Sequence, residues 1–93
     1  YGIQTYEGCV IMGNTVSGNG SSASPPVYGI FAGTGSAVIG NVAYDNGDSV
    51  TGGVFGILLD GYSLVDENTA YSNRAGYNII GIAGCVFGDN VAP

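Results

Sequence analysis

The fold is decided by the stretch Gly13-Asn14-Thr15-Val16-Ser17-Gly18-Asn19, which recurs in related form as Gly40-Asn41-Val42-Ala43-Tyr44-Asp45-Asn46. Its first half returns as Glu67-Asn68-Thr69 and Asp89-Asn90-Val91, so Asn14, Asn41, Asn68 and Asn90 are separated by 27, 27 and 22 residues. A second landmark follows the same steps: Tyr1-Gly2-Ile3, Tyr28-Gly29-Ile30, Phe55-Gly56-Ile57 and Tyr77-Asn78-Ile79. Two landmarks that share one spacing indicate an internal repeat.

The composition is that of one small acidic module. The chain has 93 residues, which predicts a single domain over residues 1–93 with repeats that start near 1, 28, 55 and 77. It carries one basic and seven acidic residues for a net charge of -6, so binding of nucleic acid or of an anionic membrane is not expected. No apolar run is near the length of about 18 residues that a membrane span needs, so membrane insertion is not expected. The start at Tyr1, without a signal-like segment, predicts a mature product or an excised piece.

Apolar and polar residues alternate over short distances within each repeat, and this period of two predicts β-strands. The 18 glycines agree with a β structure that has many turns. Alignment of the repeats gives five columns that are expected to face the interior: Ile3, Ile30, Ile57 and Ile79; Thr5, Ala32, Leu59 and Gly81; Cys9, Ser36, Ser63 and Cys85; Ile11, Val38, Val65 and Phe87; Val16, Ala43, Ala70 and Ala92. The two longer steps carry their extra residues in polar, Gly-rich or Pro-rich segments, residues 21–26 and 48–53, which are expected to be loops.

At the level of these repeats, the chain resembles the right-handed parallel β-helix repeat proteins, the pectate-lyase-like and tailspike-like solenoids. Repeats of that family read like Gly-Ile followed further on by Gly-Asn-Thr-Ile-x-x-Asn; residues 13–19 and 40–46 fit this pattern, and the resemblance covers essentially the whole chain. It implies an all-β, right-handed parallel β-helix, or β-solenoid, of about four rungs of 22 residues with two loop insertions. The family includes polysaccharide lyases, hydrolases, epimerases, tailspikes, adhesins and non-catalytic surface proteins. An extracellular or cell-surface location is therefore the expectation.

Two columns of polar residues are expected to serve the structure. A stacked Asn side chain at a corner can bond its own turn and the amide of the Asn in the next rung, about 4.8 Å away along the axis. Asn14, Asn41, Asn68 and Asn90 are therefore predicted to form a structural ladder. Cys9 and Cys85 share a column with two serines but lie three rungs apart, a separation of roughly 14 Å that excludes a disulfide within one chain. Either they are buried thiols in place of serine, or they form an intersubunit disulfide when copies stack.

Several residues that are expected to point outward are apolar: Phe31, Leu58 and Ile80; Val10, Leu64 and Val86; Tyr44 and Tyr71. Either these columns form an interface, or the phase is reversed on one strand and they belong to the core. Neither end carries a recognisable cap, so both are expected to expose strand edges: either the chain is a fragment of a longer solenoid, or these edges pair with further copies of the chain. The first functional expectation is a non-catalytic structural or adhesive module. Such a module would be a filament subunit that stacks head to tail and makes lateral contacts through its apolar faces.

Candidate catalytic residues are few. The chain has no Lys, no His and a single Arg, Arg74, so the lyase and epimerase chemistry known on this fold is not expected. Asp66, Glu67 and Asp89 fall together on adjacent repeats, whereas Asp60 has no acidic counterpart in the other repeats. The cluster is open to three interpretations: a solvated acidic corner, a weak Ca²⁺ site and a carboxylate pair for glycoside hydrolysis. The alternative function is a carbohydrate-binding or carbohydrate-processing domain with a polysaccharide partner. No catalytic residue, resident metal or cofactor is assigned.

Overall fold

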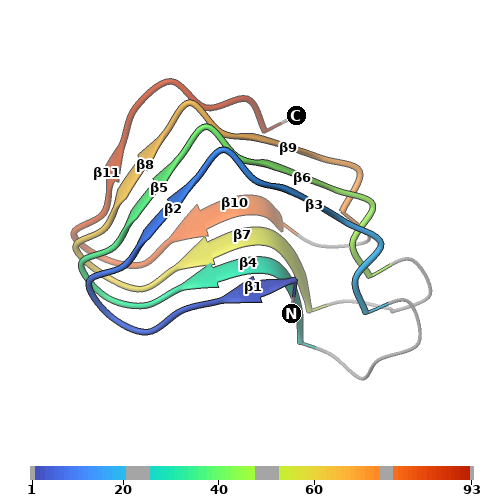
Figure 1. The fold of residues 1–93 in the computed structure, drawn as a ribbon, viewed down its shortest axis with the longest axis horizontal. Helices are drawn as coiled ribbons and strands as arrows, with labels where there is room; N and C mark the ends of the chain where they lie inside the picture. Colours follow the sequence, from blue (N-terminus) through green and yellow to red (C-terminus); the bar gives the residue numbers. More distant parts are fainter. Residues whose placement is uncertain (1, 21–25, 48–52, 74–76, 93) are drawn as a thin grey trace.

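The chain forms three parallel β-sheets, each built from strands of successive repeats (Figure 1). The computed structural model describes residues 2–20, 26–47, 53–73 and 77–92, and these residues contain no helix, hence none that could cross a membrane. The first sheet holds β1 (Ile3–Gln4), β4 (Val27–Ala32), β7 (Val54–Leu59) and β10 (Tyr77–Gly81). The second sheet holds β2 (Val10–Met12), β5 (Ala37–Ile39), β8 (Leu64–Asp66) and β11 (Val86–Phe87). The third sheet holds β3 (Thr15–Ser17), β6 (Val42–Tyr44) and β9 (Thr69–Tyr71).

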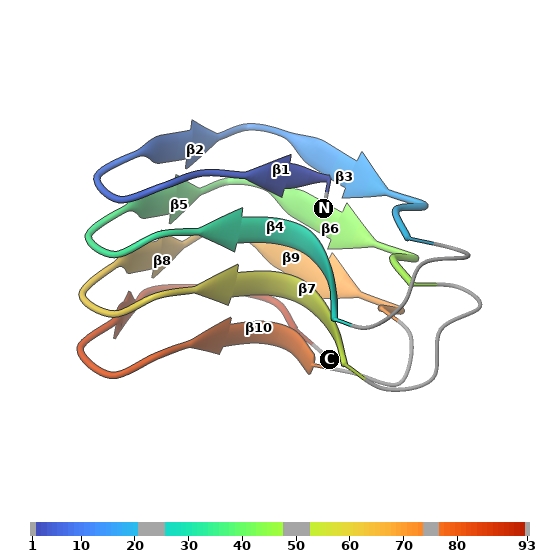
Figure 2. The same cartoon turned by 90° about the horizontal axis from the view of Figure 1, so that it is seen from below.

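The chain visits the three sheets in a fixed order, and each return places a strand beside the strand of the preceding pass (Figure 2). The register joins equivalent residues of neighbouring repeats, as in the pairs Ile3 with Ile30, Ile30 with Ile57 and Ile57 with Ile79. The second sheet does the same with Val38, which pairs with Ile11 on one side and Val65 on the other. The expected all-β architecture of parallel strands is confirmed. The expected loops fall almost entirely outside the described residues.

The core is made of the columns that the alternating pattern places inside. Ile30, Ile57, Leu59, Val38, Val65, Ala43 and Ala70 are fully buried. In the first and last repeats the same columns are less covered, because their residues have a described neighbour on one side only. Phe87 is 51% exposed and Ile79 is partly buried.

The apolar residues predicted to point outward are either exposed or partly buried, and none of them is fully buried; the partly buried ones are Phe31, Tyr44, Leu58 and Ile80. Val10 is 67% and Val86 63% exposed, and Leu64 and Tyr71 also face solvent. The phase of these strands is therefore the expected one, and the interpretation that these residues belong to the core is wrong. The second sheet therefore carries a column of apolar residues on its outer surface, which includes Val10, Leu64 and Val86.

One part of the core lies outside the predicted columns. Val27 and Val54 are almost completely buried and form a separate small cluster. They were missed because the alternation breaks at Gly29–Ile30 and at Gly56–Ile57, where two buried residues follow each other. Glycine is required at this break, since a Cβ atom on Gly29 would lie 2.6 Å from the carbonyl oxygen of Gly56.

In the part of the chain that the structure describes, one buried side-chain polar atom has no hydrogen-bond partner. The hydroxyl oxygen of Thr5 is buried and makes no hydrogen bond with the described residues. Its column continues with Ala32 and Leu59, which are apolar and fully buried. A buried hydroxyl that is left unpaired costs free energy, because its hydrogen bonds to water are lost without replacement.

We predict that Thr5→Val raises the free energy of unfolding by about 1 kcal/mol, since the replacement removes the unpaired hydroxyl and keeps the branched shape. Urea titration measures this difference. The matched control is Thr15→Val, the same change at an exposed position of β3, which is expected to stay within about 0.5 kcal/mol of the wild type. A Thr5→Val variant less stable than the wild type would contradict the prediction.

Candidate functional site

A ladder of asparagine side chains runs through the first corner of the repeats. The backbone N–H and the Nδ2 of Asn14 both donate to Oδ1 of Asn41, at 2.9 and 3.1 Å. Asn41 donates in the same way to Asn68, at 2.9 and 3.0 Å, and Asn68 to Asn90, at 3.1 Å for both bonds. All of these bonds point from one repeat to the next, so the ladder has a direction along the axis.

The inner members of this ladder are buried amides with all their groups paired. Asn41 is fully buried, and its Nδ2 also donates to the carbonyl oxygens of Ile11, at 2.9 Å, and Ile39, at 3.1 Å. Asn68 donates to the carbonyl of Val38 at 2.8 Å. Each amide therefore joins its own repeat to both neighbours, and a buried polar group is tolerated because its bonds are satisfied.

A second asparagine column occupies the next corner and ends in an unexpected residue. Asn19 donates to Oδ1 of Asn46, and Asn46 to Oδ1 of Asn73. The Nδ2 of Asn73 donates to Oδ1 of Asn78 at 3.0 Å. Asn78 stands where the other repeats have Gly2, Gly29 and Gly56. A Cβ atom on Gly56 would collide with Nδ2 of Asn73, so the substitution in the fourth repeat supplies an acceptor where the earlier repeats must leave room.

The third polar column is made of serine and cysteine. The backbone N–H of Cys9 donates to Oγ of Ser36 at 3.2 Å, and that of Ser36 to Oγ of Ser63 at 3.1 Å. Ser63 donates from Oγ to the carbonyl of Gly33, and Cys85 donates from Sγ to the equivalent carbonyl of Asp60, at 3.2 Å. Cys85 therefore makes the same bond as the serine. Both thiols are free and partly buried.

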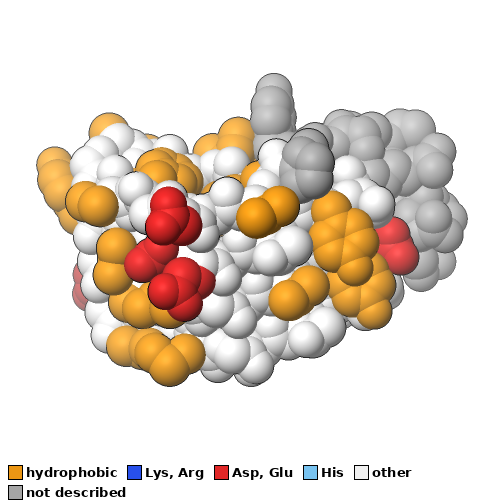
Figure 3. Space-filling view, turned by 90° about the horizontal axis from the view of Figure 1, so that it is seen from above, with side chains coloured by type: hydrophobic (Ala, Val, Ile, Leu, Met, Phe, Trp, Pro, Cys, Tyr) orange, Lys and Arg blue, Asp and Glu red, His pale blue; other side chains and the backbone are white. Residues whose placement is uncertain are grey.

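The acidic corner that the sequence singled out is only partly assembled. Oδ1 of Asp66 accepts the backbone N–H of Asp89 at 2.9 Å, whereas Glu67 is exposed and has a φ of 56°. On the face shown in Figure 3, acidic side chains gather mainly in one group among apolar ones. No group of three His, Cys, Asp or Glu among the described residues is placed to hold a metal ion. The observed role of Asp66 is to close the turn of the next repeat.

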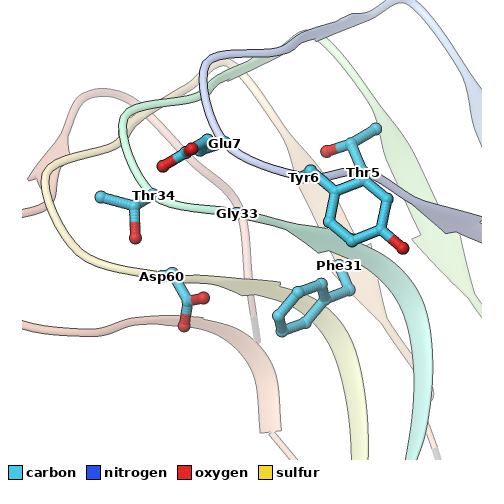
Figure 4. A pocket seen from close by; sticks show the side chains of 7 residues that line it. All are labelled: Thr5, Tyr6, Glu7, Phe31, Gly33, Thr34 and Asp60. Carbon is cyan, nitrogen blue, oxygen red and sulfur yellow. The ribbon is translucent and has the colours of Figure 1, made fainter.

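A small cavity that the sequence analysis missed lies at the turn between the first and second sheets (Figure 4). Its volume is about 250 Å³, and it is lined by Gly33 with Thr5, Tyr6, Glu7, Phe31, Thr34 and Asp60. We call it the Gly33 hollow. Figure 4 shows the rings of Tyr6 and Phe31 on one side and Glu7, Thr34 and Asp60 on the other.

The hollow arises from a break in the repeat. Tyr6, Gly33 and Asp60 are equivalent residues of three successive repeats, and the middle one has no side chain. A Cβ atom on Gly33 would lie 2.5 Å from the carbonyl carbon of Tyr6 and 2.7 Å from the nitrogen of Glu7. The close approach of the preceding repeat therefore requires glycine. In the sequence, the only sign of the hollow is that the equivalent residues Tyr6, Gly33 and Asp60 differ from one another. A comparison that looks for repeated residues does not find such a position.

No protein-family model, curated protein or solved structure matches this chain. The resemblance to the β-helix repeat proteins therefore stays a prediction from the repeat.

We predict that Asn41→Ala lowers the free energy of unfolding by about 3 kcal/mol or more, because buried donors and acceptors of three repeats lose their partners. Asn14→Ala is the matched control. It removes a partly exposed amide whose Oδ1 accepts no bond from the described residues, and the expected loss is about 1 kcal/mol. Urea unfolding of both variants measures the difference. Equal losses in the free energy of unfolding for the two variants would show that the contribution of a ladder asparagine to stability does not depend on its burial.

Proposed function

We propose that the chain is a right-handed parallel β-helix module with a non-catalytic structural or adhesive role, outside the cell or on its surface. In this proposal copies associate head to tail, so that the last repeat of one copy pairs with the first repeat of the next. The observation that carries the proposal is the direction of the polar columns. A column whose bonds all point one way has a donor end and an acceptor end, and these two ends are complementary.

The two ends of the first ladder illustrate this complementarity. Within the described residues, Oδ1 of Asn14 receives no hydrogen bond, and the backbone N–H of Asn90 donates none. If a second copy is placed one layer beyond Asn90, the Asn14 of that copy lies as far from Asn90 as Asn90 lies from Asn68. Asn90 can then donate to Oδ1 of that Asn14 as Asn68 donates to Oδ1 of Asn90. The bond between copies would then be the bond that already joins the repeats.

The cysteine column supports the same arrangement. Cys9 and Cys85 occupy the first and last positions of a column whose middle positions are Ser36 and Ser63. In a head-to-tail stack, Cys85 of one copy and Cys9 of the next become neighbours in adjacent layers, about 4.8 Å apart. This separation is within the Cα–Cα range of about 4.4–6.8 Å that a disulfide needs.

The outer surface supports lateral contacts between such stacks. The rings of Tyr44 and Tyr71 stack with centroids 5.2 Å apart, and the exposed column of Val10, Leu64 and Val86 adds an apolar strip on another sheet. Apolar surface of this continuity is typical of an interface. The net charge of -6 opposes lateral packing at low salt.

The first test is electrophoresis of the oxidised protein without reductant. We expect a ladder at multiples of 9.3 kDa that collapses with reductant. Cys9→Ser and Cys85→Ser should each abolish every band above the dimer, because a chain with one thiol can join only one partner. A ladder that survives in either single variant would contradict the Cys9–Cys85 pairing.

The second test separates stacking from the disulfide. The double variant Cys9→Ser, Cys85→Ser is expected to form elongated particles in negative-stain electron microscopy at high protein concentration, because the asparagine ladder and strand edges remain. Compact single particles from the wild type and the double variant alike would overturn the proposed head-to-tail assembly.

We predict that lateral bundling of these particles increases with salt, because ions screen the repulsion between acidic copies over a distance of about 8 Å at physiological ionic strength. Light scattering between low and high NaCl concentration measures it. Bundling that is independent of ionic strength would show that charge does not govern the lateral contact.

A further inference from the structure

The Gly33 hollow combines an aromatic surface with an acidic one. One wall is aromatic, from Tyr6 and Phe31, and the other is acidic, from Glu7 and Asp60 (Figure 4). The hydroxyl-bearing Thr34 lies on the acidic side. The cavity of about 250 Å³ is below the range of about 300–1,000 Å³ that takes drug-sized ligands, so the ligand has to be small.

The Phe31 half of the aromatic wall is held in place by neighbouring rings. Phe31 meets Tyr28 with ring centroids 5.4 Å apart in a tilted arrangement, and Tyr28 stacks on Phe55 at 5.4 Å. Phe31 is half-buried in this row, whereas Tyr6 is 83% exposed. The face of Phe31 is therefore fixed, and Tyr6 is the side chain that can adjust to a ligand.

The acidic wall has no cationic partner in the described part of the chain. No hydrogen bond or ion pair to the carboxylate of Glu7 or Asp60 is found among the described residues, which contain no Lys or Arg. The two carboxylates give the hollow a negative potential, and an aromatic ring adds to it where its face, which is also negative, meets a ligand. An anionic ligand is repelled from such a site.

We propose that the Gly33 hollow binds a small organic cation of the quaternary ammonium class. A quaternary ammonium group has an apolar surface that packs on the rings and a diffuse positive charge that the rings and carboxylates both attract. A primary ammonium is more strongly hydrated, so it loses more on entering a half-open site. The proposal does not depend on head-to-tail assembly, since every residue of the hollow comes from one chain.

The test is an NMR titration of the full chain with choline, followed through the amide signals of Gly33 and Thr34. Binding in the millimolar range is expected, with a Kd of about 1–10 mM, because the site is open and each contact is weak. The neutral isostere 3,3-dimethylbutan-1-ol has the same shape without the charge and is expected to bind at least about five-fold more weakly. n-Butylammonium, the primary ammonium probe, is expected to bind more weakly than choline.

Variants assign the binding to this site. Glu7→Gln and Asp60→Asn should each raise the Kd for choline about three-fold, and Tyr6→Leu, which keeps apolar area but loses the ring, by a similar factor. The matched control is Asp45→Asn, which removes the same charge from an exposed position outside the hollow. It is expected to leave the Kd within experimental error, and unchanged amide signals elsewhere check that each variant folds.

Three outcomes would overturn the proposal. Equal binding of choline and its neutral isostere would make the hollow an apolar site only. Shifts at Gly33 and Thr34 with glucose or maltose but not with choline would make it a carbohydrate site. An absence of shifts with choline at about ten times the expected Kd would show that the hollow binds no such cation.

Discussion

The hydrogen bond from one asparagine to the side-chain oxygen of the asparagine in the next repeat is the constraint on which the structure depends. The amides of Asn41 and Asn68 are buried, so each donor and acceptor must be paired within the chain. The pairing works at one spacing and one register only. A slip by one residue would leave these amides unpaired and would also turn the core residues of the neighbouring strands toward solvent. The polar corner and the apolar core therefore select the same alignment of repeats.

This agreement explains why so much of the fold could be predicted from the sequence. The spacing of the asparagines aligns the repeats, and the alternation of residues such as Ile11 then tells which columns face inward. Val27 and Val54 could not be found in this way, because their strands bend at a glycine where two buried residues follow each other. The reason for that glycine is the approach of Asn46 and of the neighbouring main chain, which is a property of three dimensions and leaves no periodic signal.

The site was less predictable than the fold for a related reason. A search for columns of equal residues finds Asp66, Glu67 and Asp89, where the structure gives Asp66 a local role in the turn. It passes over the Gly33 hollow, because that hollow exists where the column changes from one residue type to another. Asn78 was missed in the same way: it departs from the glycine of its landmark and thereby supplies the acceptor that Asn73 needs. In a repeat protein, the positions at which one repeat differs from the others can therefore mark features that belong to that repeat alone.

Interior and solvent-facing positions of this molecule thus differ in how strongly they are coupled to the neighbouring repeats. Interior positions are paired with their equivalents on both sides, so a change in one repeat disturbs two others. Solvent-facing side chains at the corners, such as Tyr6 and Glu7, are less constrained, although the main chain beneath them still requires Gly33, so an individual repeat can acquire a ligand there without loss of register. If copies stack head to tail, the Gly33 hollow recurs once in every copy along the assembly. A site whose single affinity is only millimolar would then act together with its neighbours on a surface that displays many cations, and avidity can exceed single-site affinity by about 10²–10⁴ when the spacing matches.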